Sequence, residues 1–248
     1  MFLQEVVPQS ESILRNQLKE YTIFSGRMWN GFPAQYYTMT LIRKEAAAVI
    51  SNRVVDFESS VMTRNVIVTK VNCNGIILNL LNTHLESTKD FASHRMRQLL
   101  RMRDLVKEMP PTEPVILAGD LNMRDKELAE SGGLPEGWID VWEATGKRPE
   151  CRYTWDTMRN DNLDTNFGKF KPRCRFDRVL VRDSKPSKLI PKTFSLIGLE
   201  RLKPHVCFPS DHWGILTVFN TFGVSVTGSD EGPAVRPADP NSPSKAAN

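Results

Sequence analysis

Carboxylate and amide side chains directly follow one apolar run of the sequence. Residues 115–118 (Val-Ile-Leu-Ala) lead into Gly119-Asp120-Leu121-Asn122. In an extended chain, residues two apart point to the same side, so Asp120 and Asn122 can address one site. A strand that ends in an Asx turn shows the same residues, and this motif alone leaves both interpretations open.

Two histidines stand at similar positions. His84 follows the apolar run 76–82, and His212 precedes the run 215–219. A lone histidine after a strand is more often the partner of a nearby carbonyl than a catalytic group. An imidazole beside a carboxylate, however, has a pKa close enough to neutrality to hold or move a proton.

Three further carboxylates complete the group. Asp177 lies inside the apolar stretch 175–181, Asp211 directly precedes His212, and Glu5 ends the short apolar start of the chain. A buried Asp is costly unless it is paired, and an imidazole is a natural partner for it. The sequence therefore predicts one site built from Glu5, His84, Asp120, Asn122, Asp177, Asp211 and His212.

This set of side chains suits phosphoryl chemistry with Mg²⁺. Oxygen donors are the ligands of a hard cation, and Mg²⁺ usually takes one or two carboxylates and keeps several waters. The metal and the imidazoles neutralise charge on the phosphoryl oxygens, while a carboxylate orients the attacking water. The sequence has neither a G-x-x-x-x-G-K-[ST] loop for nucleotide phosphates nor a C-x-x-C pair for zinc.

Short strands and two helical patterns must position these side chains. Asn74-Gly75 is the favoured type I′ turn and predicts a hairpin between the two flanking runs. Strands and helices interleaved over this length predict a layered α/β protein with a mixed sheet. The predicted strands are 38–42, 66–71, 76–82, 115–118, 175–181 and 214–219, and the predicted helices are 10–19 and 91–109.

Composition is that of an ordinary globular protein. Of the 248 residues, 40% are hydrophobic and 25% charged, which excludes a fully disordered or fibrous chain. No apolar stretch approaches the roughly 18–20 residues of a membrane helix, so no membrane partner is expected. Residues 221–248 are rich in proline and poor in large apolar side chains, which predicts a disordered tail after a domain of residues 1–220. The net charge is +4, and it becomes +5 without this acidic tail, which permits a polyanionic partner.

The ordered motifs LQE, THLES, GDLN, TWDT, RFDR and SDH resemble the exonuclease–endonuclease–phosphatase superfamily over residues 2–219. The resemblance implies a four-layer α/β/β/α sandwich with a metal-dependent phosphodiesterase site. Within the superfamily, the chain is most similar to enzymes that release tyrosine from DNA. This implies Mg²⁺-dependent hydrolysis, with Mn²⁺ as an alternative, of the 5′-phosphotyrosyl bond between DNA and a topoisomerase II peptide remnant. The product would be a 5′-phosphate end for DNA repair in the nucleus, and the DNA partner would carry a single-stranded 5′ overhang.

The same resemblance implies a role for each residue. Asp120 and Asn122 would hold and activate the attacking water. His84 and His212 would contact the nonbridging oxygens, and Asp177 would fix His212. The implied metal residues are Glu5 and Asp211. The implied substrate- and DNA-binding residues are Arg124, Trp155, Phe176, Tyr36 and Ser87, where stacking of the aromatic rings on terminal bases contributes about 1–3 kcal/mol per base.

Some expectations remain alternatives. The family's early strand with a T-W-N type motif is not found ahead of LQE, which predicts a domain that lacks its N-terminal strand and helix. The alternative functions are those of an abasic-site endonuclease, another nuclease of the superfamily, or an inactive truncated DNA-binding relative. Four arginines of the second helical pattern predict either a phosphate-binding stripe or a solvated face: Arg95, Arg97, Arg101 and Arg103.

Overall fold

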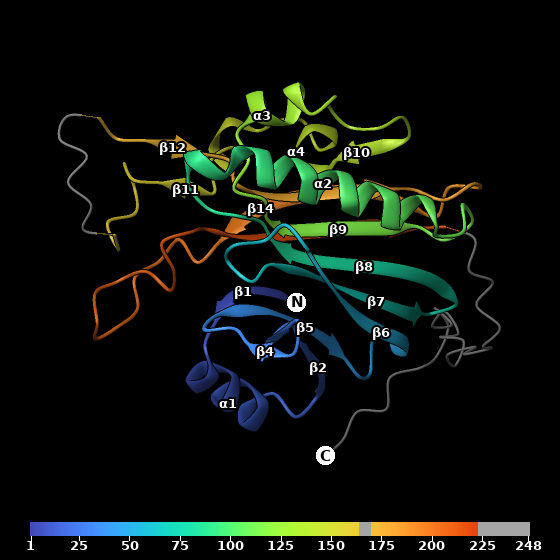
Figure 1. Ribbon diagram of the computed structural model, residues 1–248, viewed down its shortest axis with the longest axis horizontal. Helices are drawn as coiled ribbons and strands as arrows, with labels where there is room; N and C mark the ends of the chain where they lie inside the picture. The colour runs from blue at the N-terminus through green and yellow to red at the C-terminus, as the bar shows by residue number, and fades with distance from the viewer. Residues whose placement is uncertain (164–169, 223–248) are drawn as a thin grey trace, which may run out of the picture.

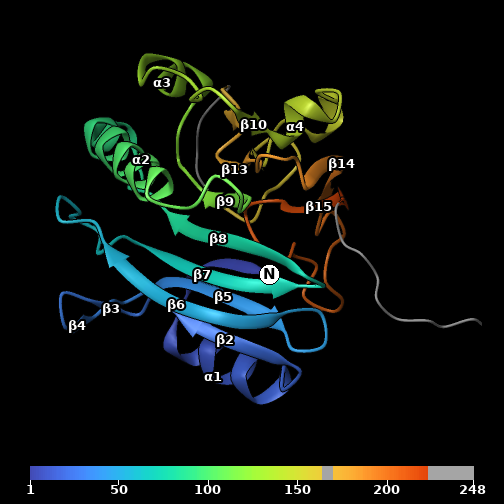
Figure 2. The same ribbon diagram turned by 90° about the vertical axis from the view of Figure 1, so that its right-hand side faces the viewer.

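Two sheets lie face to face between helices in the computed structural model, which describes residues 1–163 and 170–222 (Figure 1). Helices α2, α3 and α4 lie outside the larger sheet and α1 lies outside the smaller one, and the view turned by 90° shows the same order (Figure 2). The predicted four-layer α/β/β/α architecture is therefore confirmed. The helices are α1 (Pro8–Gln17), α2 (Ala92–Lys107), α3 (Asp125–Glu130) and α4 (Val141–Ala144), with 3₁₀ turns at Lys89–Phe91 and Pro149–Cys151.

The larger sheet is mixed, as predicted. Its strands run in the order β10-β13-β9-β8-β7-β6, with β8 and β9 parallel and the other neighbours antiparallel. A parallel pair needs a crossover connection, and α2 supplies it. The β7–β8 hairpin turns at Asn74 and Gly75, whose φ angles of 49° and 86° fit the predicted type I′ turn. The strands are β6 (Ala48–Asp56), β7 (Asn65–Cys73), β8 (Ile76–His84), β9 (Val115–Asp120), β10 (Trp138–Asp140) and β13 (Asp177–Arg182).

The remaining strands form one three-stranded sheet and three pairs. The smaller sheet has the order β1-β5-β2, and the pairs are β3–β4, β11–β12 and β14–β15. These strands are β1 (Phe2–Val6), β2 (Tyr21–Ser25), β3 (Met28–Trp29), β4 (Phe32–Pro33), β5 (Tyr37–Arg43), β11 (Trp155–Asp156), β12 (Arg173–Cys174), β14 (Leu189–Ile197) and β15 (Gly214–Thr221).

Apolar side chains fill the spaces between these layers. The largest cluster joins α2 to the larger sheet through Leu81, Leu99, Met102, Leu117 and Leu180. A second cluster joins β13, β14 and α4, and a third lies between α1 and the smaller sheet. Burial on both faces holds the ends of β8, β9 and β13 in fixed positions.

Strands β1 and β15 border one groove with a cavity of about 330 Å³. Phe2 and Gln4 line it from β1, Ile215 and Phe219 from β15, and Ala118 from β9. In the described part of the chain, β1 pairs only with β5, and β15 pairs only with β14. The predicted lack of an N-terminal strand and helix is not tested by the described residues, and it stays a prediction.

The predicted strands and helices are all present, with shifted ends. The elements that were not predicted are the longer strands β2, β6 and β14, the short strands β3, β4, β10, β11 and β12, and the helices α3 and α4. Most side chains of β6 are exposed, so the strand lacks the apolar alternation that marks a half-buried strand. In β14, Pro191 stands beside an irregularity in the pairing with β15, and proline in an apolar run argues against a strand. The predicted tail begins at Thr221, which is the last residue of β15, and residues 223–248 lie outside the described residues.

The four arginines of α2 form neither of the two predicted alternatives, a phosphate-binding stripe or a solvated face, as a complete set. Arg95 is fully buried, and its Nε and Nη2 donate to the carboxylate of Glu127 at 3.1 and 2.9 Å. Arg103 donates from Nη1 to the Ser131 carbonyl at 3.0 Å. These two side chains bind protein rather than phosphate, which leaves Arg97 and Arg101 as the exposed members. Among the described residues, no helix combines the length and apolar character needed to cross a membrane.

Candidate active site

The registers of three adjacent strands bring the predicted site together. Asp120, the last residue of β9, lies opposite His84 at the end of β8 and opposite Asp177 at the start of β13. The β8 and β9 strands are parallel and β13 is antiparallel to β9, so all three residues lie at the same edge of the sheet. The sequence predicted polar residues at strand ends, and the registers confirm that these ends meet.

Gly119 allows this close approach. Its φ of +141° lies in a region that side chains rarely adopt, and a Cβ built there would lie 1.9 Å from the carbonyl oxygen of Thr83. Any other residue would push β8 and β9 apart at the Thr83–Gly119 pair, which is next to the pair of His84 with Asp120. The glycine of the GDLN motif is therefore required by the backbone.

Asp120 and Asn122 form a tight turn after β9. Asp120 accepts hydrogen bonds from the Asn122 backbone N–H (2.8 Å, Oδ1) and from Asn122 Nδ2 (3.2 Å, Oδ2). Asn122 has a φ of 50°, a left-handed conformation that Asn tolerates. The Asx turn is therefore present, and it holds the side chains of Asp120 and Asn122 together, although Asn122 is not extended as the prediction assumed.

Asp177 and His212 form a hydrogen-bonded pair. His212 Nδ1 lies 2.7 Å from Asp177 Oδ2, and the Asp177 backbone N–H donates to Thr154 Oγ1 at 3.1 Å. Burial opposes a charged ring, but the nearby Asp177 carboxylate, with further help from Asp120 and Asp211, raises the pKa of His212 to about 10. The ring is therefore an imidazolium at neutral pH, and Nδ1–H donates to Asp177. The pairing predicted for Asp177 and His212 is present.

His84 has the opposite electrostatic environment. Its Nδ1 lies 3.1 Å from Nη1 of Arg64, and its Nε2 lies 3.3 Å from Asp120 Oδ2. Burial, followed by the charges of Arg64 and His212, lowers the pKa of His84 well below its usual value. A guanidinium only donates, so Nδ1 accepts and the ring proton lies on Nε2, facing Asp120. The two histidines therefore differ in charge.

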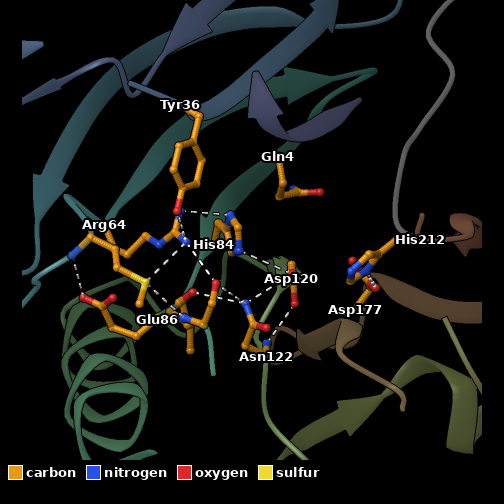
Figure 3. A network of polar contacts seen from close by, with 12 residues as sticks. Gln4, Tyr36, Arg64, His84, Glu86, Asp120, Asn122, Asp177 and His212 are labelled. Carbon is orange, nitrogen blue, oxygen red and sulfur yellow. Dashed lines mark hydrogen bonds and ion pairs between the residues drawn. The ribbon is translucent and has the colours of Figure 1, made fainter. Parts of the chain in front are cut away.

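Arg64 was not predicted as a site residue. Besides His84, its guanidinium contacts Tyr36 Oη at 3.0 Å and Ser87 Oγ at 3.1 Å, and it lies 4.7 Å from the Tyr36 ring centroid. Figure 3 shows these contacts as one network that continues to Asp120 and Asn122. Tyr36 and Ser87 thus join the site through Arg64. A single arginine ahead of an apolar strand carries no spacing signal that would have identified it.

An aromatic pair borders the imidazolium. The rings of Trp155 and Phe176 have centroids 5.7 Å apart, and Phe176 lies 6.4 Å from the ring of His212. A backbone bridge between Trp155 and His212 links the TWDT and SDH motifs. Both aromatic side chains are partly exposed, so they present ring surface beside the site, as predicted.

Asp120, Asp177 and His212 offer oxygen and nitrogen atoms within 4.8 Å of one another, close enough to hold a metal ion. Burial, the charge of Asp177 and, more weakly, that of Glu5 raise the pKa of Asp120 above its usual range, although His212 and the Asn122 N–H oppose this rise. Such crowding of negative charge is what a bound divalent cation relieves. These oxygen donors fit a hard cation.

The two predicted metal residues do not belong to this group. Glu5 is exposed, with a φ of 55°, at an irregularity in the pairing of β1 with β5. Its neighbour Gln4 donates from Nε2 to Asn82 Oδ1 at 2.9 Å (Figure 3). Asp211 Oδ2 lies 3.9 Å from His212 Nε2. Both carboxylates border the site, and their predicted role as metal ligands stays a prediction.

Arg124 lies outside the hydrogen-bond network of Asp120. It stands at the exposed start of α3, with its Nη1 3.6 Å from Glu127 Oε1. There it lines a cleft of about 410 Å³ together with Arg152, Tyr153 and Arg173. The predicted contact of Arg124 with the phosphodiester stays a prediction.

Comparison with known proteins agrees with this geometry. The family model described as Endonuclease/Exonuclease/phosphatase family matches residues 1–212. Tyrosyl-DNA phosphodiesterase 2 of Xenopus laevis is 41% identical over 89% of this chain and 57% of its own length, and that of Homo sapiens is 39% identical over 87% and 58%. The chain thus spans a little over half the length of these curated relatives. A crystal structure of D. rerio TDP2 with a single-strand DNA product superposes with a TM-score of 0.82 at 38% identity, covering 89% of this chain and 85% of that one. Since the family model covers most of the sequence and the fold and site agree with it, this chain belongs to the Endonuclease/Exonuclease/phosphatase family.

Proposed function

We propose that this chain is a divalent-metal-dependent phosphodiesterase that hydrolyses the 5′-phosphotyrosyl bond between DNA and a peptide remnant of topoisomerase II. The observation that carries the proposal is the site itself. A buried carboxylate, Asp120, lies between a neutral imidazole, His84, and the imidazolium of His212, which is paired with Asp177. Relatives at about 40% identity carry the name tyrosyl-DNA phosphodiesterase 2, which favours this bond over other phosphodiesters.

Each side chain has a defined task in this reaction. Asp120, whose pKa is raised by burial, is suited to accept a proton from the attacking water near neutral pH, and Asn122 holds Asp120 in place. The imidazolium of His212 stabilises negative charge on a nonbridging phosphoryl oxygen. His84 presents an Nε2–H toward the same region. The phosphodiester is cleaved by water directly, so the products are a 5′-phosphate and a free tyrosyl hydroxyl.

The donor set fits a resident cation. The carboxylates of Asp120 and Asp177 would hold Mg²⁺, or Mn²⁺ as the alternative, with Glu5 and Asp211 as the further proposed ligands. When bound, the metal would supply Lewis-acid stabilisation of charge on the phosphoryl group. The protein's own contribution is the fixed edge of β8, β9 and β13, which keeps these donors from moving apart.

The Trp155–Phe176 pair supports DNA as the substrate. Aromatic rings beside a phosphodiester site stack on nucleobases without regard to sequence. The solved D. rerio relative was crystallised with single-strand DNA, which favours a single-stranded 5′ end on this substrate. Tyr36, Ser87 and Arg124 are proposed to contact the tyrosyl or phosphodiester part. Work on such DNA ends would place this protein in the nucleus.

The test is hydrolysis of a 5′-phosphotyrosyl oligonucleotide by the purified chain, with Mg²⁺, with Mn²⁺ and with EDTA. We expect metal-dependent release of tyrosine and a 5′-phosphorylated product. A duplex with an abasic site serves as the parallel substrate. Cleavage of that duplex without release of tyrosine would replace the proposal with an abasic-site endonuclease. DNA binding without any turnover would indicate an inactive relative.

A further inference from the structure

Glu86 is a buried carboxylate that the proposed reaction does not use. It is fully buried, in the loop directly after β8 and His84. Its Oε1 accepts hydrogen bonds from Ser60 Oγ (2.6 Å) and from the backbone N–H groups of Val61 (2.8 Å) and Met62 (3.3 Å). Its Oε2 has no hydrogen-bond partner among the described residues. Burial of a half-satisfied carboxylate is costly, so its contacts with the 60–62 loop need an explanation.

Ser60 connects this carboxylate to Arg64. The Ser60 hydroxyl donates to Glu86 and accepts the backbone N–H of Arg64 at 2.7 Å. The hydroxyl is buried, with the residue only 7% exposed, so no other group of the loop replaces it easily. Glu86 and Ser60 together therefore set the path of the chain from residue 60 to residue 64.

The side chain of Arg64 connects this loop to the candidate active site. Its guanidinium reaches His84 Nδ1, Tyr36 Oη and Ser87 Oγ within 3.0–3.1 Å. Because the guanidinium is planar and its donors are fixed relative to one another, a small shift of the Arg64 backbone changes all three contacts at once. The contact with His84 decides which ring nitrogen carries the proton.

We propose that Glu86 and Ser60 are positioning residues that act through Arg64 on His84. The inference rests on the proposed phosphodiesterase function for its kinetic readout, but the contact chain is independent of the substrate. Loss of the Ser60 hydroxyl leaves the Arg64 N–H without its acceptor and removes the shortest of the loop's three hydrogen bonds to Glu86. The guanidinium then leaves His84, and the ring loses the partner that holds its Nε2–H toward Asp120.

A double-mutant cycle separates this role from simple stabilisation. We expect Ser60→Ala to lower kcat about tenfold, as loss of one buried hydrogen bond allows, with KM changed less than about twofold. In an Arg64→Met background, Ser60→Ala should change kcat less than about twofold, because its route to His84 is already gone. The fall in Tm caused by Ser60→Ala should be the same in both backgrounds. A tenfold kcat effect in both backgrounds would overturn the proposal.

Two further variants sharpen the cycle. Ser184→Ala is the matched control, because Ser184 is also buried (4% exposed) and its hydroxyl makes one hydrogen bond, to the Pro186 carbonyl at 2.7 Å, away from the site. It should lower Tm and leave kcat unchanged. Glu86→Gln keeps an acceptor at Oε1 and should retain most of kcat, whereas Glu86→Leu should resemble Ser60→Ala. Equal loss of kcat in Glu86→Gln and Glu86→Leu would also count against the proposal.

An NMR readout keeps the inference testable without turnover. In the wild type, the ¹⁵N shifts of His84 should show an unprotonated, hydrogen-bonded Nδ1. Ser60→Ala and Arg64→Met should both move the Nδ1 shift in the same way, and Ser184→Ala should leave it in place. Wild-type protein that cleaves an aryl ester of thymidine 5′-phosphate but no tyrosyl-DNA would contradict the proposed function. The kcat values of the double-mutant cycle can then still be measured with the aryl ester, so the positioning role is tested separately. Unmoved His84 shifts in Ser60→Ala would refute the positioning role whatever the substrate.

Discussion

The Nδ1 atom of His212 lies 2.7 Å from Oδ2 of Asp177, whereas the Nδ1 atom of His84 lies 3.1 Å from a nitrogen of Arg64. The first ring is paired with a carboxylate, and its pKa is raised to about 10; the second is buried beside a cation, and its pKa is lowered. Asp120 stands between them. The site therefore offers a cationic donor and a neutral donor to one phosphoryl group.

Asp120→Asn should abolish most turnover without preventing DNA binding. The substitution keeps the size of the side chain and removes the group that accepts a proton, which contributes about 10²–10⁴-fold in rate. Tyrosine release and fluorescence anisotropy with a labelled oligonucleotide measure the two effects. Asp104→Asn, at an exposed carboxylate on α2, is the control and should behave as wild type. A variant with more than about a tenth of wild-type kcat would remove Asp120 from the mechanism.

The Mg²⁺ requirement should depend on pH. Burial and Asp177 raise the pKa of Asp120, so a larger fraction of Asp120 is protonated as the pH falls toward 6. A proton on this carboxylate competes with a cation. The Mg²⁺ concentration for half-maximal activity should therefore rise from pH 8 to pH 6, and EDTA should stop turnover at every pH. A constant half-maximal concentration across this range would show that Asp120 does not bind the metal.

Asp125→Asn should destabilise the fold in a pH-dependent way. Asp125 pairs with the buried Arg178 and Arg175 at 2.7 and 2.9 Å, and these partners lower its pKa to about 2 although burial opposes the shift. The folded pKa lies below the unfolded value of 3.8, so the stabilisation is present above about pH 4 and is lost as the pH falls through about 2. We expect a cost of about 1–2 kcal/mol at pH 7, because solvent screens this half-exposed side chain.

Urea unfolding of the wild type and Asp125→Asn measures this cost. The difference in unfolding free energy should be the same at pH 7 and pH 5 and should shrink as the pH is lowered toward 2. A difference that stays constant down to the lowest accessible pH would mean that the charge of Asp125 contributes nothing.

Trp155→Ala should weaken binding of single-stranded DNA. Loss of one stacking ring costs about 1–3 kcal/mol, which corresponds to about 5- to 150-fold in Kd. Trp155→Phe keeps a ring beside Phe176 and should retain most of the affinity. Equilibrium binding with a short labelled oligonucleotide tests both variants. Equal affinities of Trp155→Ala and the wild type would leave the aromatic pair with a packing role alone.

Arg95→Ala should destabilise the protein far more than Arg101→Ala. Arg95 is fully buried and binds the partly buried Glu127 through two hydrogen bonds, so its removal leaves that carboxylate with only the longer contact to Arg124, at a cost of about 3 kcal/mol. Arg101 is exposed on the same helix, and its removal should change the unfolding free energy by less than about 0.5 kcal/mol. Similar Tm values for the two variants would contradict the distinction drawn from their burial.

The sequence was informative where chemistry and strand pattern coincide. Asp120, Asn122 and His84 directly follow apolar runs, and His212 directly precedes one, so their residue types and their positions pointed to the same site. Arg64 had neither signal, because its importance comes from contacts with Tyr36, His84 and Ser87 that are 20–28 residues away. The spacing of the four arginines on α2 did not predict their environments, for a related reason. Spacing alone does not reveal which arginines of a helix meet a buried carboxylate.

The linear order of residues by itself determined the family, the layered α/β architecture and the strands whose ends carry the site, because local apolar pattern and short motifs are properties of consecutive residues. Only the tertiary structure decided the charge states of the two histidines. Asp177 reaches His212 across 35 residues and Arg64 reaches His84 across 20, and a pKa depends on which charge lies nearby rather than on neighbours in the chain. The chain of hydrogen bonds from Glu86 through Ser60 to Arg64 is likewise visible only in the tertiary structure, because these contacts join a buried loop to a residue that follows β8.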